Sequence, residues 1–195
     1  MNVSELNSIA KAMVSNGKGI LAADESTPTI KKRFDTIGAE STFDTRQRYR
    51  EMLFTTEGLN QYIGGVILFD ETLRQSTSED ILFPKYLSDL GIVPGIKVDA
   101  GAKPLAGYEG ETVTEGLDGL RDRLAEYSNL GAKFAKWRAV IHISESVPSS
   151  FCIKSNAHAL ARYAALCQEI NIVPIVEPEV LMDGTHDISR CEEVT

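Results

Sequence analysis

Residues 134–141 read Phe-Ala-Lys-Trp-Arg-Ala-Val-Ile, an apolar run that carries Lys136 and Arg138 two positions apart. A short run that is nearly continuous in apolar residues is typical of a strand buried in a parallel sheet. Four further runs have the same character, at residues 19–24, 64–69, 95–99 and 172–179. The chain is therefore predicted to contain five buried strands.

Segments with apolar residues at helical spacing separate these strands. They predict helices around residues 4–16, 27–38, 44–56, 114–130 and 156–169, and residues 183–186 are expected to form a loop after the fifth strand. Strands that alternate with helices imply parallel βα units whose sheet is covered by helices. The predicted fold class is α/β.

Composition and charge narrow the classes of function. Of the 195 residues, 43% are hydrophobic and 25% are charged, as in folded globular chains. The net charge is −8 and no block of Lys or Arg stands out, which argues against nucleic acid and anionic membranes as partners. No apolar run approaches the ~20 residues of a membrane-spanning helix, and the first residues lack a secretory signal pattern. A cytoplasmic location is expected.

The cysteines and histidines do not form a metal-ligand pattern. The cysteines are odd in number and lack a Cys-x-x-Cys spacing, so we expect free thiols, without a disulfide framework or a zinc site. The histidines share no ligand spacing, so no metal is expected. These residues are Cys152, Cys167, Cys191, His142, His158 and His186.

Charged residues two positions apart recur late in three predicted strands. Alternate residues of a strand face the same side, so each pair shares a face. The carboxyl ends of parallel strands form the active-site floor of a (β/α) barrel. Surface charges on edge strands, or ion pairs that merely tie strands together, are the alternative, but charges in step on four strands favour a shared wet cavity. The residues are Lys97 with Asp99, Lys136 with Arg138, Glu177 with Glu179, and Asp24 at the end of the first strand.

This combination of side chains indicates carbonyl or enolate chemistry. A buried lysine next to other cations can form a Schiff base with a carbonyl substrate, and a carboxyl group in such a cluster can move protons. The residues alone leave either Lys97 or Lys136 as the candidate amine and indicate Glu177 as the candidate proton shuttle. The same lysines and arginine could equally hold phosphate groups.

Seven motifs, in order along essentially the whole chain, resemble class I fructose-bisphosphate aldolase. They are Gly-Lys-Gly-Ile-Leu-Ala-Ala-Asp-Glu-Ser (17–26), Gly-Gly-Val-Ile-Leu-Phe (64–69), Gly-Ile-Lys-Val-Asp (95–99), Pro-Leu-Ala-Gly (104–107), Gly-Leu-Asp-Gly-Leu (116–120), Phe-Ala-Lys-Trp-Arg (134–138) and Ile-Val-Pro-Ile-Val-Glu-Pro-Glu (172–179). The resemblance implies a (β/α)₈ TIM barrel. About the first five βα units are expected here, as one partial barrel domain over residues 1–195.

The resemblance also implies a reaction and roles for individual residues. The reaction is the glycolytic, reversible cleavage of fructose 1,6-bisphosphate to dihydroxyacetone phosphate and glyceraldehyde 3-phosphate through a lysine Schiff base, without metal or cofactor. The implied catalytic residues are Asp24 for carbinolamine and carbon–carbon bond chemistry, Lys136 for electrostatic assistance, Glu177 as general acid/base and Glu179 in its support. The implied substrate-binding residues are Ser26, Thr29 (where the family usually has serine), Arg33, Arg46, Lys97 and Arg138. Full-length members of the family are expected to be homo-oligomers.

One family feature has no counterpart in these 195 residues. The Schiff-base lysine lies on the sixth strand, in a Leu-Leu-Lys-Pro setting, so the chain is expected to be an N-terminal part that ends in the helix after the fifth strand and is inactive alone. Two alternatives stay open. One is an enzyme that has moved its Schiff base to Lys136, and the other is a non-catalytic half-barrel that associates through open sheet edges.

Overall fold

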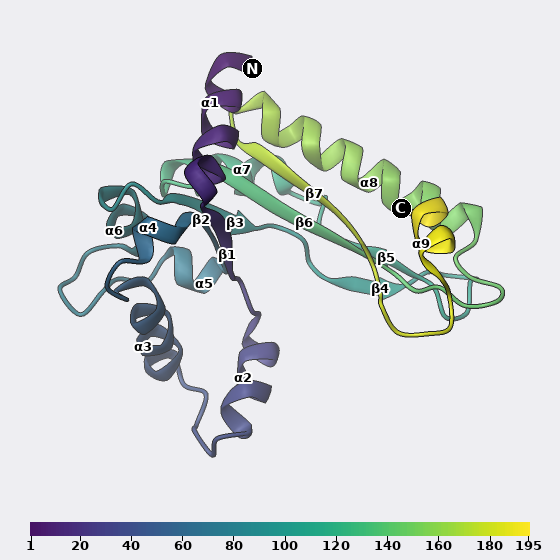
Figure 1. Cartoon of the computed structure of the whole chain (residues 1–195), viewed down its shortest axis with the longest axis horizontal. Helices are drawn as coiled ribbons and strands as arrows, with labels where there is room; N and C mark the ends of the chain where they lie inside the picture. The colour runs from purple at the N-terminus through teal and green to yellow at the C-terminus, as the bar shows by residue number, and fades with distance from the viewer.

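The five predicted strands form one parallel sheet in a computed structural model, which describes residues 1–195 apart from the side chain of Asn16. The strand order is β1-β2-β3-β6-β7, so each strand lies beside the next parallel strand along the chain (Figure 1). This is the order of the first five strands of a (β/α)₈ barrel, and the predicted fold class is confirmed. The strands are β1 (Gly19–Ala23), β2 (Ile63–Leu68), β3 (Val93–Lys97), β6 (Phe134–Ile141) and β7 (Val173–Val180).

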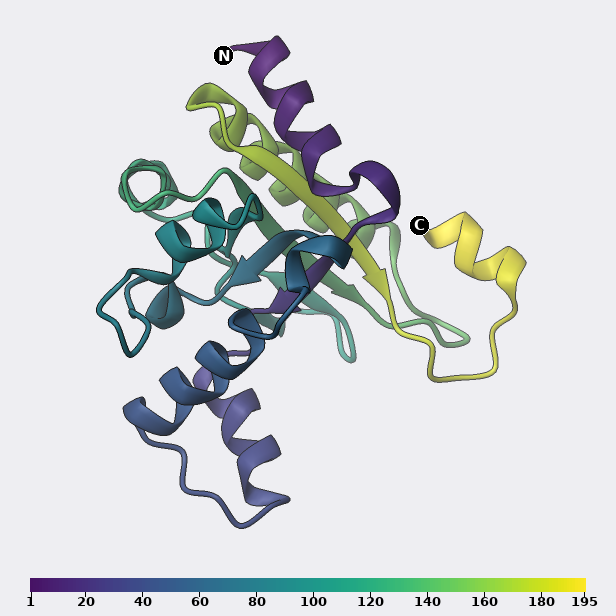
Figure 2. The ribbon, with the colours of Figure 1, turned by 60° about the vertical axis from the view of Figure 1, so that its left-hand side comes forward.

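Helices connect the strands and cover the sheet. Figure 2 shows α8 running along β6 and β7, while α2 and α3 extend away from the sheet beyond the end of β1. In the described part of the chain, no helix has the length and apolarity needed to cross a membrane. The helices are α1 (Val3–Met13), η1 (Ser15–Gly17), α2 (Thr27–Asp35), α3 (Phe43–Phe54), α4 (Leu59–Tyr62), α5 (Asp70–Leu73), α6 (Phe83–Asp89), α7 (Leu120–Asn129), α8 (Ser150–Glu169) and α9 (Ile188–Val194).

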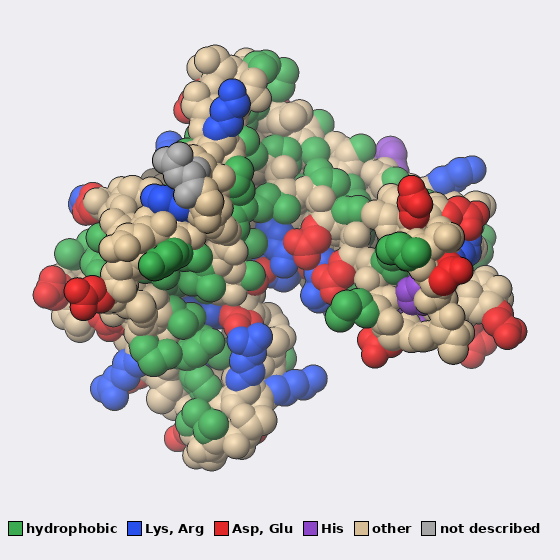
Figure 3. All heavy atoms as spheres, viewed as in Figure 1, with side chains coloured by type: hydrophobic (Ala, Val, Ile, Leu, Met, Phe, Trp, Pro, Cys, Tyr) green, Lys and Arg blue, Asp and Glu red, His purple; other side chains and the backbone are tan. Residues whose placement is uncertain are grey.

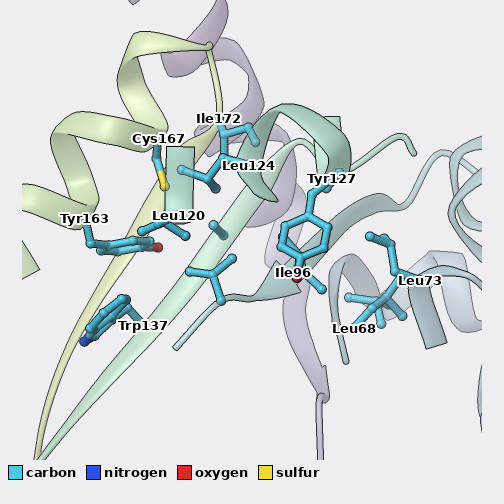
Figure 4. Packing of buried hydrophobic residues seen from close by; sticks show 14 of the residues in the cluster. Leu68, Leu73, Ile96, Leu120, Leu124, Tyr127, Trp137, Tyr163, Cys167 and Ile172 are labelled. Carbon is cyan, nitrogen blue, oxygen red and sulfur yellow. The ribbon is translucent and has the colours of Figure 1, made fainter. Parts of the chain in front are cut away.

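Alternation along β6 separates the core from the opposite face of the sheet. Trp137 is fully buried on the helix-covered face, where its ring lies 5.5 Å from that of Tyr163 in α8, measured between centroids (Figure 4). Lys136 and Arg138 flank Trp137 and therefore face the other side. Ala135 and Ala139 join Trp137 in the main hydrophobic cluster. The same alternation thus supplies the core and the charged face.

The opposite face is closed at its amino-terminal end by α1 and Phe134. Met13, Ile67 and Phe134 form a separate buried cluster there. Glycine is required in the neighbouring strand, because a Cβ added at Gly95 would lie 2.3 Å from Cζ of Phe134. This apolar cluster fills the amino-terminal end of the face, so the charged residues lie toward the carboxyl-terminal end of the sheet.

The predicted helix over residues 114–130 is wrong in its first third. Thr112–Thr114 forms strand β5, which pairs antiparallel with β4 (Ala102–Pro104), and α7 begins only at Leu120. Gly116 and Gly119 have φ values of 131° and 62°, in the region that favours glycine and interrupts a helix. The predicted helix over 156–169 begins earlier, at Ser150, where the side chain of Ser149 accepts a hydrogen bond from the Cys152 N–H.

Candidate active site

A cavity of about 380 Å³ opens at the carboxyl ends of β1, β3 and β6. Figure 3 shows side chains of both charges gathered at the centre of this view. A larger cavity of about 660 Å³ lies between the β5–α7 loop and α8, but none of the predicted site residues lines it. Seven of the ten predicted site residues line the smaller cavity: Asp24, Ser26, Thr29, Arg33, Lys97, Lys136 and Arg138.

The strand register brings the predicted charges into adjacent rows. Lys97 of β3 is the register partner of Lys136 in β6. Arg138 of β6 is in turn the partner of Glu177 in β7. Directly paired residues of neighbouring parallel strands project from the same face of the sheet. The register therefore explains why residues from three separate motifs meet.

Lys136 is the centre of the cluster. Its Nζ lies 3.2 Å from Oδ2 of Asp24 and 3.5 Å from Oε1 of Glu177, and its side chain is 10% exposed. Burial raises the pKa of Glu177, and the positive charge of Lys136 only partly opposes this effect, so the net shift is upward. The Glu177 carboxyl therefore keeps its proton to higher pH than an ordinary glutamate, as a general acid must.

The other two charged pairs differ in burial. Lys97 Nζ donates to Oδ1 of Asp99 at 2.6 Å and to the Asp99 carbonyl at 3.0 Å, and the Asp99 side chain is buried. Arg138 Nη1 lies 3.1 Å from Oε2 of Glu179, and both of these side chains are exposed or nearly so. Solvent screens the second pair, so Arg138 is freer to exchange Glu179 for a ligand.

Two hydroxyl groups at the start of α2 and an arginine in its last turn line the same cavity. The hydroxyl oxygens of Ser26 and Thr29 lie 3.1 Å apart, and Arg33 forms an ion pair with Glu25. The Arg33 side chain is 58% exposed although it lines the cavity. Hydroxyl groups at the start of a helix, with a guanidinium group in the same cavity, suit an anionic group such as phosphate.

Arg50 of α3 is a residue that the sequence reasoning missed. Its side chain is 2% exposed, and it pairs with the Glu25 carboxylate while Nη2 donates to the Glu25 carbonyl at 3.0 Å. Burial raises the pKa of Glu25, but the hydrogen bond and charge of Arg50 outweigh this and hold the pKa below its usual value. The available signal was spacing, since Arg50 stands four residues before the buried Phe54 on one helix face.

Three predicted residues do not line the cavity. Glu177 and Glu179 reach the cluster through Lys136 and Arg138, as described above. Arg46 is held elsewhere, because its Nε and Nη2 lie 2.7 Å and 2.6 Å from the two carboxylate oxygens of Glu71. Its placement near the substrate stays a prediction.

The ligands of a metal centre are not assembled in this structure. Among the described residues, no group of three or more His, Cys, Asp or Glu side chains could hold a metal ion. Cys152 and Cys167 are buried free thiols and Cys191 is a partly exposed one. The cavity therefore offers amines, guanidinium groups, hydroxyls and carboxylates as its reactive groups.

Comparisons with known proteins identify relatives of this chain. A family model described as "Fructose-bisphosphate aldolase class-I" matches residues 5–195. A "Probable fructose-bisphosphate aldolase class 1" of Xanthomonas campestris is 64% identical over 195 residues, which are the whole of this chain and 58% of that protein. "Fructose-bisphosphate aldolase 4, cytosolic" of Arabidopsis thaliana is 55% identical over 98% of this chain and 49% of its own length.

A solved structure gives the same result in three dimensions. The fructose-bisphosphate aldolase of Plasmodium falciparum, in complex with TRAP and a small-molecule inhibitor, matches with a TM-score of 0.94 and 49% identity. The match covers 98% of this chain and 56% of that one, so the chain spans about half the length of the relatives it matches. The parallel sheet with its helices is accordingly part of a TIM barrel, and the chain belongs to the class I fructose-bisphosphate aldolase family.

Proposed function

We propose that these 195 residues supply the proton-transfer and phosphate-binding part of an enzyme that reversibly cleaves fructose 1,6-bisphosphate to dihydroxyacetone phosphate and glyceraldehyde 3-phosphate. The observation that carries this proposal is the buried ammonium group of Lys136 between Asp24 and Glu177. The proposed partner is a sugar phosphate, and no metal or cofactor takes part. The proposed place of action is the cytoplasm, as the name of the plant relative says of that protein.

Glu177 is the proposed general acid and base. A carbinolamine becomes a Schiff base when its hydroxyl takes a proton and leaves as water. The protonated Glu177 carboxyl donates that proton and is left as a carboxylate, which the neighbouring Lys136 charge stabilises. Asp24, on the other side of Lys136, is proposed to act in the carbon–carbon bond step.

The substrate phosphates are proposed to bind around the rim of the cavity. Lys97, Arg33 and Arg138 supply positive charge, and Ser26 with Thr29 supplies hydroxyl donors. Glu179 supports the site through its pair with Arg138. Arg46 would have to leave Glu71 to reach a phosphate, so its contribution is proposed only for a rearranged site.

The amine that forms the covalent intermediate is proposed to lie on a sixth strand outside these 195 residues. The test is borohydride reduction of the 195-residue chain with dihydroxyacetone phosphate, followed by peptide mapping. No stable adduct is expected at Lys97 or Lys136, because both ammonium groups are engaged with carboxylates. An adduct on Lys136, together with cleavage that Lys136→Met abolishes, would establish the alternative in which Lys136 carries the Schiff base.

The phosphate-binding part of the proposal has its own test. Inorganic phosphate and fructose 1,6-bisphosphate should shift the NMR signals of Arg33, Lys97 and Arg138, and Lys97→Ala should weaken binding about tenfold, as expected for a charge-assisted hydrogen bond. Lys85→Ala is the matched control, because Lys85 is an exposed lysine paired with Asp89 outside the cavity. Equal binding by the two variants would contradict the proposed site.

A second candidate function rests on the sheet edges. β1 and β7 stand at the two ends of the five-stranded sheet, so each has one edge unpaired within it. Unpaired edges can recruit further strands. A non-catalytic half-barrel that associates through these edges would form oligomers without binding sugar phosphates, which separates it from the first proposal.

A further inference from the structure

Asp99 shares the charged face with Lys97, but the roles implied by the family resemblance leave it unassigned. It follows β3 directly and lines the same cavity as Lys97 and Lys136. Its side chain is 3% exposed, so its carboxylate is withdrawn from water. A buried carboxylate is strongly unfavourable unless a cation and hydrogen-bond donors compensate it.

The compensation comes from two neighbours. Oδ1 of Asp99 accepts from Lys97 Nζ at 2.6 Å and from the Gly101 N–H at 3.0 Å. Oδ2 is buried and has no hydrogen-bond partner among the described residues. Among the side chains that the structure describes, Lys97 is the only cation in direct contact with this carboxylate. Lys97 in turn is fixed at two acceptors, the carboxylate and the Asp99 carbonyl.

The backbone around Asp99 is itself held in place. Arg123 of α7 donates to the carbonyls of both Val98 and Gly116, which joins the loop after β3 to the loop before α7. The two loops are in close approach, because a Cβ added at Gly116 would lie 2.8 Å from the Ala100 nitrogen and 3.2 Å from the Asp99 Cα. Asp99 is thus a fixed point from which Lys97 is oriented.

We propose that Asp99 is a positioning residue that holds the Lys97 ammonium group in the cavity, beside Lys136. Lys97 and Lys136 are register partners, so two positive charges lie side by side. Each has its own carboxylate, Asp99 for Lys97 and Asp24 for Lys136. The distance from Lys97 Nζ to Asp99 Oδ1 is 2.6 Å, shorter than the 3.2 Å from Lys136 Nζ to Asp24 Oδ2, so Lys97 is held more closely by its carboxylate. The inference rests on the proposed function only in treating Lys97 as a substrate-binding group.

The test is competitive acetylation of lysines with limiting acetic anhydride, with rates read by peptide mass spectrometry. In Asp99→Asn, Lys97 should be acetylated about tenfold faster than in the unmodified sequence, the change expected for loss of one charge-assisted hydrogen bond. Lys136 should change less than about threefold, because its partners are untouched. A merely structural role for Asp99 would accelerate Lys97 and Lys136 together.

Asp89→Asn is the matched control, since it removes the partner of the exposed Lys85. It should leave Lys97 unchanged and alter Lys85 less than about twofold, because an exposed pair is weak. An unchanged rate at Lys97 in Asp99→Asn, or parallel acceleration of both lysines in a folded variant, would overturn the proposal. No substrate is used, so failure of sugar-phosphate binding gives a separate result.

A measurement on the unmodified chain covers the case in which Asp99→Asn does not fold. With ¹⁵N-labelled lysine and ¹³C-labelled aspartate, the Lys97 ammonium signal should show a coupling across the hydrogen bond to the Asp99 carboxyl carbon. Lys85 should show none to Asp89, because water competes for both exposed groups. Absence of the Lys97 coupling would count against the proposal.

Discussion

At the scale of single residues, Glu177 is governed by two opposing effects. Burial raises its pKa and Lys136 lowers it, with burial the stronger. Lys136→Met removes the opposing charge, so the pKa of Glu177 should rise further. The measurement is a ¹³C carboxyl NMR titration, and Glu193→Gln, which alters an exposed carboxyl, is the control and should leave the Glu177 curve unchanged. A fall in the Glu177 pKa in Lys136→Met would contradict this account of the site.

The raised pKa of Glu177 also determines whether its contribution to stability rises or falls with pH. A carboxyl whose pKa is higher in the folded than in the unfolded chain binds its proton more tightly when folded. Its contribution to the free energy of unfolding is fully present below the unfolded pKa and is lost as the pH rises through the folded pKa. Glu177→Gln should therefore flatten the decline in stability above the ordinary range of glutamate titration.

Arg50 should be important for stability although it does not line the cavity. Arg50→Met leaves the Glu25 carboxylate buried without its main cation, which should cost about 3–5 kcal/mol in the free energy of unfolding by urea. Lys31→Met, in an exposed pair with Asp35, should cost no more than about 0.5 kcal/mol. Adding Glu25→Gln to Arg50→Met should recover part of the loss, and no recovery would show that the pair itself is not the cause.

Glu25 adds a second pH dependence, of opposite sign to that of Glu177. Its pKa is lower in the folded chain, so its contribution to stability is present above the unfolded pKa and is lost as the pH falls through the folded pKa. Arg50→Met should remove much of this acid sensitivity, which unfolding by urea at a series of pH values measures. An unchanged acid limb of the stability profile would contradict the assigned cause.

Sequence alone identified the charged residues of the strands more readily than the buried arginine of α3. Lys97, Lys136 and Glu177 stand out because charge is unusual late in an apolar strand. Arg50 is marked only by its spacing to Phe54, because an arginine in a helix with many charged residues normally faces water. Its burial depends on Glu25, which lies 25 residues away in the chain and next to it only in space.

At the scale of elements, strands were predicted better than the segment after β3. All five parallel strands lie within about two residues of their predicted bounds, because apolar runs report burial directly. The β4–β5 hairpin was missed, and its last residue, Thr114, was assigned to a helix. Thr112 and Thr114 donate from their hydroxyls to the carbonyls of Val140 and Arg138, so contacts distant in sequence fix this strand. The spacing of apolar residues along the sequence cannot predict contacts between residues this far apart in the chain.

Gly95 of β3 lies directly against the Phe134 ring of β6. Gly95→Ala places a methyl group against the Phe134 ring and should destabilise the fold by about 1–3 kcal/mol, the usual cost of overpacking. Gly19→Ala in β1 meets no atom within 4 Å and should cost much less. Urea unfolding measures both, and the Phe134→Leu background should relieve part of the Gly95→Ala penalty. Equal costs at the two glycines would contradict the described packing of β3 against β6.

At the scale of the whole molecule, the sheet edges give the main prediction. Size-exclusion chromatography over a range of concentrations should show association of the 195-residue chain, because β1 and β7 each have an edge unpaired within the sheet. Val176→Lys places a charge on β7 at a valine that is 48% exposed and should shift the population toward smaller species. Met182→Lys, at a fully accessible residue beyond β7, is the control and should have little effect. A concentration-independent monomer would contradict association through these edges.

The register between β3 and β6 fixes the cavity and the core together, because alternate residues of β6 face one and then the other. A slip of one residue would turn Trp137 toward the cavity and Lys136 into the apolar layer under α8. A mutation that shifts the strand register would therefore change the spacing of Lys97 and Lys136 and disrupt the packing of Trp137 at the same time. At these two strands, selection that maintains the folded core also maintains the positions of the Lys97 and Lys136 amines.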